Sequence, residues 1–171
     1  MKRLLLLALP LALAACTKPA DPAETPVDAT PTTSTPAVAA NTTDVSLLPK
    51  YHWRLTEAND AQGQRIGALL VRADQPVQLD FRDGNVGVSN TCNRMGGTYT
   101  VADGSLTAGR LVSTQMACAD GAVMALDQEV GKRLEGTLKM ATTAGETPSL
   151  TLTTATGDVL VFAGQPTAET R

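Results

Sequence analysis

From about residue 50 onward, the chain consists of short runs in which apolar and polar residues alternate, separated by Gly, Asp and Asn. In residues 150–153 the leucines fall at every second position, so one face of an extended strand can be buried while the other meets water. Turn residues recurring about every eight to twelve positions are typical of an antiparallel sheet. The pattern predicts strands at 51–56, 77–81, 85–90, 98–101, 105–108, 138–142, 150–153 and 159–162.

Two of the predicted connections have explicit turn sequences. Asp83-Gly84 and Asp103-Gly104 each lie between two predicted strands. An Asp-Gly pair favours the positive φ angles that a tight hairpin requires. The flanking strands are therefore expected to pair antiparallel, and a sheet curled around one core fits best.

One segment, residues 120–134, departs from the strand pattern. Its apolar residues recur at three- and four-residue steps, and charged residues fall between them. This spacing predicts one amphipathic helix, whose apolar face comprises Val123, Leu126, Val130 and Leu134. The predicted fold class is therefore α+β: a strongly curved antiparallel β-sheet, an open or cracked barrel of about eight strands, with one packed α-helix.

The beginning of the chain has the order of an export signal. Lys2-Arg3 precede an apolar run from Leu4 to Leu13, and two alanines stand before Cys16. The run is about half as long as a membrane-spanning helix needs. Residues 13–16, Leu-Ala-Ala-Cys, resemble the lipobox of bacterial lipoproteins, which implies removal of residues 1–15 and acylation of Cys16. The alternative is an ordinary secretory signal with a chance cysteine.

This resemblance also implies a location. Several acyl chains on Cys16 would hold the protein stably on a membrane. Thr17, where Asp is absent, predicts sorting to the outer membrane of a two-membrane cell, with the protein facing the periplasm. The formal net charge of −3 indicates no attraction to nucleic acid, so no nucleic-acid partner is expected.

Residues 16–46 are rich in Pro, Thr and Ala and contain almost no large apolar residue. Such a segment cannot bury enough surface to fold, and closely spaced prolines favour extended stretches. We expect a disordered tether that carries a domain at 47–164, followed by a disordered tail at 165–171. A partner-recognition segment is the alternative interpretation of the tether.

Once Cys16 is assigned to lipid, Cys92 and Cys118 remain. Two cysteines in an exported domain pair by default, so we predict a Cys92–Cys118 disulfide. A redox-active pair is the alternative, although the close Cys-x-x-Cys spacing of such pairs is absent.

The residues around both cysteines resemble two signatures of one family. Residues 91–99, Thr-Cys-Asn-Arg-Met-Gly-Gly-Thr-Tyr, are similar to the Gly-Cys-Asn-x-x-x-Gly-x-Tyr signature of the META domain, also called the HslJ-like domain. Residues 113–118, Ser-Thr-Gln-Met-Ala-Cys, resemble its second signature, Ser-Thr-x-Met-Ala-Cys. The resemblance covers about residues 50–163. Thr91 stands where the family often has Gly, and 60–76 has no clear counterpart.

The resemblance implies a single α+β domain and no enzymatic activity, and it links the chain to heat-shock response, novobiocin resistance and envelope or motility functions. We expect a membrane-anchored, non-enzymatic envelope lipoprotein that supports envelope integrity and tolerance of stress or antibiotics. The alternative is a binding module whose apolar groove holds a lipid, a hydrophobic ligand or a secretion-system subunit.

Candidate catalytic and metal-binding residues are few. His52 is the only histidine, Gly-x-Ser-x-Gly and Ser-x-x-Lys patterns are absent, and His52 is expected at the surface near a strand end. Paired cysteines would leave one imidazole and scattered carboxylates, so neither a metal nor a cofactor is expected. A hydrolase or redox enzyme is the third hypothesis. A pocket that joins His52 to Ser or acidic side chains would favour it.

The polar residues best suited to recognition are Asn90, Asn93 and Arg94, which with Gly96 and Gly97 form a candidate recognition loop. Capping of buried backbone groups is the alternative role of the polar residues. The two glycines are expected to let the backbone turn sharply beside the disulfide.

Four methionines are expected to fill the core rather than to line a groove. They are Met95, Met116, Met124 and Met140.

Overall fold

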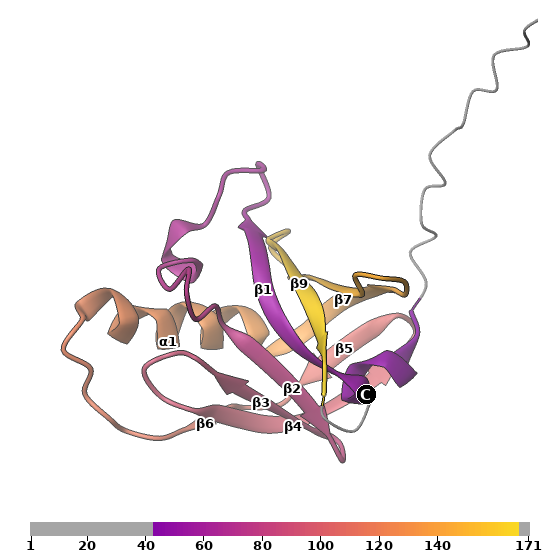
Figure 1. Cartoon of the computed structure of the whole chain (residues 1–171), viewed down its shortest axis with the longest axis horizontal. Coiled ribbons are helices and arrows are strands. Elements are labelled where there is room, and N and C mark those ends of the chain that lie inside the picture. The colour runs from indigo at the N-terminus through magenta and orange to yellow at the C-terminus, as the bar shows by residue number, and fades with distance from the viewer. Residues whose placement is uncertain (1–42, 168–171) are drawn as a thin grey trace, which may run out of the picture. The chain divides into compact units, whose positions relative to one another are not determined.

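The computed structural model describes residues 43–167, which form an antiparallel β-barrel (Figure 1). Its strands are β1 (Tyr51–Asn59), β2 (Gln78–Arg82), β3 (Asn85–Ser89), β4 (Met95–Ala102), β5 (Ser105–Ala108), β6 (Val112–Ser113), β7 (Gly136–Thr143), β8 (Ser149–Thr153) and β9 (Val159–Pro166). All except β6 form a ring in the order β3-β2-β1-β9-β8-β7-β5-β4, and pairing of β4 with β3 closes it. The predicted fold class is confirmed. Closure leaves no long unpaired edge in the ring.

The Asp-Gly turns set the register of two hairpins. Asp83 and Asp103 both have φ of 49°, and Gly84 and Gly104 both have φ of 72°. These paired positive angles give the primed turns whose twist matches that of the flanking strands. They connect β2 to β3 and β4 to β5, as the sequence predicts.

The first half of β4 differs from expectation. The expectation that Gly96 and Gly97 turn the backbone is wrong, because β4 begins at Met95 and both glycines pair with β3. Gly96 also pairs with Val112 of β6, a strand too short to leave a periodic pattern. A Cβ on Gly97 would lie 2.8 Å from the carbonyl oxygen of Arg110. Close approach of two backbones is therefore what requires glycine at position 97.

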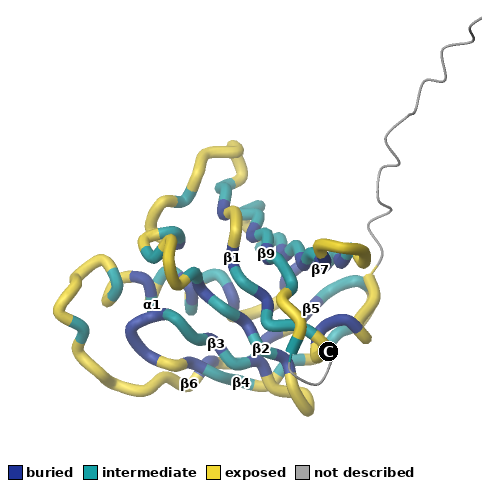
Figure 2. The backbone as a smooth tube through the Cα atoms, viewed as in Figure 1, coloured by how far each residue is buried: buried dark blue, intermediate teal, exposed yellow. Residues whose placement is uncertain are grey.

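Large side chains fill the interior of the barrel. Trp53, Leu79 and Leu150 have no exposed surface, and Phe162 is 1% exposed. The indole Nε1 of Trp53 donates to the carbonyl oxygen of Leu48 at 2.9 Å, so its one polar atom is satisfied. Every buried side-chain nitrogen or oxygen within residues 43–167 has a hydrogen-bond partner. The barrel interior is therefore a packed core (Figure 2).

The 3₁₀ helix η1 (Val45–Lys50) covers one end of the barrel with its buried Leu47 and Leu48. Immediately before it, the Thr43 hydroxyl donates to the Met140 carbonyl at 3.1 Å, and the Asp44 N–H donates to the Thr142 hydroxyl at 2.9 Å. The fold thus begins before the expected start at residue 47, and β9 continues past the expected end at residue 164. Residues 1–42, which include the predicted signal, Cys16 and most of the tether, lie outside the described residues, as do 168–171.

The helix α1 (Gly121–Leu134) lies at the opposite end of the barrel, against the short helix η2 (Gly67–Leu69) (Figure 1). Leu126, Val130 and Leu134 enter the core, as the periodicity predicts, whereas Val123 is only partly buried and lies outside the core. Asp120 caps the helix by accepting the Ala122 N–H at 2.8 Å. No helix in residues 43–167 is long and apolar enough to cross a membrane.

An ion-pair network fixes the last turn of α1 to the barrel. The Arg133 guanidinium donates from Nε to Asp158 at 2.8 Å, in the connection between β8 and β9, and also pairs with Glu129. The hydrogen bond from Arg133 holds the pKa of Glu129 below its ordinary value.

We predict that Trp53→Ala lowers the free energy of unfolding by about 3 to 5 kcal/mol, because it leaves a cavity in a closed core. Trp53→Phe, which keeps most of the volume but leaves the Leu48 carbonyl without its donor, should cost about 1 to 3 kcal/mol. Denaturant unfolding measures both. Val112→Ala, at a side chain that is 76% exposed, is the control and should stay within about 0.5 kcal/mol of wild type. Similar losses in Trp53→Ala and Val112→Ala would contradict the assigned core.

Candidate functional site

A disulfide joins Cys92 and Cys118 at the α1 end of the barrel, with their Cα atoms 5.9 Å apart. Cys92 follows β3, and Cys118 lies just before the Asp120 cap of α1. The bond therefore connects the barrel wall to the entrance of the helix across 26 positions of sequence.

The side-chain amide of Asn93 connects the two cysteine-bearing segments. Asn93 is 7% exposed, and its Oδ1 accepts the Thr114 hydroxyl at 2.9 Å and the Met116 N–H at 2.6 Å. Its Nδ2 donates to the Met116 carbonyl at 3.2 Å and to Asp127 Oδ2 at 2.7 Å. Both ends of the amide are occupied inside the protein, so Asn93 caps buried groups and presents nothing to a ligand.

Asp127 of α1 completes this network. Its carboxylate accepts the backbone N–H groups of Cys92 at 2.9 Å and Asn93 at 3.1 Å, in addition to the Asn93 amide. The helix therefore holds the loop after β3 by charge-assisted hydrogen bonds that span about one-fifth of the chain. Asp127 cannot be recognised from the sequence, because helical periodicity marks it only as polar.

Asn90 is also used internally. It has a φ of 66°, and its Nδ2 donates to the Pro76 carbonyl at 2.9 Å. Its own carbonyl accepts Nη1 of Arg72 at 3.3 Å. Of the predicted recognition loop, the glycines lie in β4 and both asparagines are engaged, which leaves Arg94 as the exposed side chain.

A surface hollow of about 310 Å³ lies where the two signature segments meet; we call it the motif hollow. Arg94 bonds to the Thr114 hydroxyl through its backbone N–H at 3.2 Å, which leaves its guanidinium outside this contact. Arg72, from the loop between η2 and β2, is the second arginine on this hollow. Residues around it include Arg72, Ser89, Thr91, Arg94, Thr114 and Met116. The strand and helix patterns carry no signal for Arg72, which lies 22 positions from Arg94.

The methionines divide into two pairs. Met95 and Met140 are 7% and 4% exposed and belong to the core. The expectation of core filling is wrong for Met116 and Met124, which are 63% and 38% exposed. The Sδ atom of Met124 accepts the Cys118 N–H at 3.2 Å and lies 3.3 Å from the Cys92 sulfur, so it packs on the disulfide instead. Figure 2 shows the loop between β6 and α1, which includes Met116, as an exposed segment.

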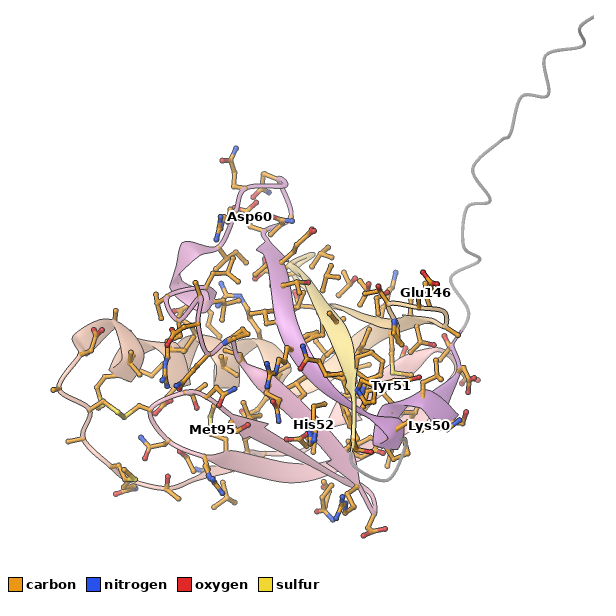
Figure 3. All side chains as sticks on the ribbon, viewed as in Figure 1. Lys50, Tyr51, His52, Asp60, Met95 and Glu146 are labelled. Carbon is orange, nitrogen blue, oxygen red and sulfur yellow. A yellow bond between two sulfur atoms is a disulfide. The ribbon has the colours of Figure 1, made fainter. Side chains whose placement is uncertain are left out.

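His52 lies on the outer face of β1, toward the η1 end and next to Tyr51 (Figure 3). Its Nδ1 bonds to Asp80 on the neighbouring strand β2, and Gln78 Nε2 donates to the other Asp80 oxygen at 2.9 Å. The side chains of His52 and Asp80 are 44% and 41% exposed. A second hollow of about 310 Å³ adjoins them, with Arg82 and Asn85 on its border.

In the His52–Asp80 pair a carboxylate bonds to Nδ1 of an imidazole, which is the contact by which an acidic side chain orients a histidine in catalytic sites. Neither Ser nor Cys lies among the residues around this second hollow. In residues 43–167, no cluster of three or more His, Cys, Asp or Glu side chains is placed to hold a metal ion.

The chain is similar to one described protein family and to solved structures of other proteins. A family model described as the META domain matches residues 46–167. A solved NMR structure of a protein from Burkholderia xenovorans has a similar fold, with a TM-score of 0.60 and 22% identity over 70% of this chain and 85% of that one. A crystal structure of a DUF4847 family protein from Bacteroides vulgatus matches at 12% identity with a TM-score of 0.46, covering 71% of this chain and 97% of that one. No curated protein matches the sequence.

We predict that Asp127→Asn lowers the free energy of unfolding by about 1.5 to 3 kcal/mol, because the carboxamide loses the charge and turns an NH₂ group toward N–H donors. Denaturant unfolding measures the change. Glu146→Gln, a matched substitution at an exposed position between β7 and β8, should stay within about 0.5 kcal/mol. Equal effects of the two substitutions would contradict the role of Asp127.

Reduction of the disulfide should lower the melting temperature. For the loop that this bond closes, the chain-entropy model gives about 3 to 4 kcal/mol of stabilisation. Calorimetry with and without reductant measures the shift, and mass mapping of alkylated cysteines checks the redox state. An unchanged transition, together with free thiols at Cys92 and Cys118 before reduction, would refute the bond.

Proposed function

The chain belongs to the META domain family, and from this membership we propose that it is a membrane-anchored, non-enzymatic envelope lipoprotein that supports envelope integrity and tolerance of stress or novobiocin-type antibiotics. In this proposal Cys16 carries the acyl chains, residues 17–42 form the tether, and the barrel is the functional part.

The observation that carries the proposal is the combination of a lipobox-like sequence at 13–16 with a disulfide-bonded domain. Disulfides persist in the periplasm and at cell surfaces and are rare in the cytosol of most bacteria. The Cys92–Cys118 bond therefore supports export of the chain. The leader sequence predicts export independently, from the order of its charged, apolar and small residues.

A non-enzymatic role is supported by the packing of the barrel. Its interior is filled by Trp53, Phe162 and leucines, which leaves little room for a substrate inside the barrel. His52 does lie beside an acidic side chain, which is the arrangement that would favour a hydrolase. However, the residues around that hollow include no Ser or Cys, and both partners are well exposed to water.

The alternative of an internal apolar groove finds little support in the same packing. The motif hollow and the hollow beside His52 both lie on the outer surface, and polar residues form most of their borders. If the barrel is a binding module, its outer surface is the place where ligands or partners are recognised.

Fractionation of cells that express the full chain tests the anchor. We expect the wild-type protein in outer-membrane fractions with a mass that matches an acylated Cys16, and Cys16→Ser released in soluble form. Thr17→Asp should be retained in the inner membrane, because Asp after the cysteine opposes outward sorting in the lipoproteins that this leader resembles. An unprocessed, unacylated wild-type chain in the cytosol would refute the proposal.

The role in tolerance is tested in a deletion strain. Novobiocin sensitivity of that strain should rise, and the wild-type gene should restore tolerance while Cys16→Ser does not. Restoration by Cys16→Ser would separate the function from the anchor. Unchanged sensitivity to novobiocin and to envelope stress in the deletion strain would overturn the proposed role.

A further inference from the structure

We propose that the motif hollow binds a phosphate group, carried by a free phosphate ester or by a lipid headgroup, between the guanidinium groups of Arg72 and Arg94. This inference concerns the barrel alone and holds whether or not Cys16 anchors the chain. It assigns a ligand class to the surface where the two signature segments meet.

The motif hollow is positively charged. The residues around the motif hollow include two arginines and no Asp or Glu. Neither Arg72 nor Arg94 forms an ion pair with a carboxylate within the described part of the chain. The nearby carboxylate of Asp127 is already held by N–H groups of Cys92 and Asn93. In a chain with a net charge of −3, this hollow is a local concentration of unpaired positive charge.

The guanidinium group of Arg72 is held at the hollow by contacts within the protein, before any ligand binds. Its Nη1 donates to the Asn90 carbonyl at 3.3 Å, and its Nη2 is bonded to Gln75. Asn90 directs that carbonyl by adopting a φ of 66°. The other non-glycine residues with positive φ, Asp83 and Asp103, are explained by their hairpin turns, whereas Asn90 lies at the end of β3. Because the Asn90 side chain also donates to the Pro76 carbonyl, the Asn90 carbonyl that accepts from Arg72 is fixed in place.

The arginine side chains around the hollow suit the oxygen atoms of a phosphate group. Guanidinium groups bond bidentately to phosphate oxygens, and two of them balance a dianion. The Ser89 hydroxyl adds a neutral polar group on the same border, whereas the Thr91 and Thr114 hydroxyls already donate to Asn93. The volume of about 310 Å³ exceeds that of a phosphate ion, which leaves room for the organic group of an ester. Met116, 63% exposed at the border, offers an apolar contact to that group.

The test is an NMR titration of the purified full chain, in a neutral detergent, with inorganic phosphate and separately with glycerol 3-phosphate. We expect saturable shifts of amide signals in residues 89–94 and 114–116. Arg94→Ala should weaken binding at least about tenfold, because it removes charge-assisted hydrogen bonds. Arg94→Lys should recover only part of the affinity, because an ammonium cannot form the planar fork.

Arg82→Ala is the matched control, since it removes the same charge from the far end of the β2–β3 hairpin. At physiological salt, where the Debye length is about 8 Å, the charge of Arg82 is screened from the motif hollow. The Arg82→Ala variant should therefore bind the phosphate probes with an affinity close to that of wild type. Tighter binding of glycerol 3-phosphate than of phosphate would identify an ester or headgroup as the source, and the reverse would identify the free ion. Absence of saturable binding with both probes, or equal weakening by Arg94→Ala and Arg82→Ala, would overturn the proposal.

Discussion

The buried amide of Asn93 is the contact on which the α1 end of the barrel depends. This side chain accepts two hydrogen bonds, from Thr114 and Met116, and donates two, to Met116 and Asp127. These bonds join the loop after β3 to the loop after β6 and to the helix. A buried amide is costly unless all its donors and acceptors are paired, so these segments are fixed together or not at all. The disulfide crosses the same junction and limits how far its two sides can separate when the chain unfolds.

The parts of the fold that follow from local chemistry are predictable from the sequence. The Asp-Gly turns fix the register of two hairpins, and alternation of side chains then marks the neighbouring strands. The helix ends at Leu134, where its apolar period ends. β6 and the first half of β4 escape prediction because their structure depends on neighbours distant in sequence: Gly97 is extended because it pairs with Val86 of β3, and it must be glycine because the backbone at Arg110 lies against it.

In the candidate site, too, local sequence marks some residues, but their roles depend on residues distant in sequence. A motif can mark Asn93 and Arg94 as noteworthy, but only the fold shows that the asparagine is enclosed and the arginine is free. Asp127, which bonds to Asn93, lies 34 positions away from it, and Arg72, which borders the same hollow as Arg94, lies 22 positions from Arg94; neither has a periodic signature. Polar residues that act through long-range hydrogen bonds look the same in sequence as ordinary surface residues.

The chain enters the barrel at η1, which contacts β1 and β2, whereas the motif hollow lies at the far end of β3, beside its last residue Ser89. The first described residues and the motif hollow therefore lie at opposite ends of the barrel. The strands between these two ends form a closed ring, so the distance from η1 to the motif hollow is fixed by the barrel itself.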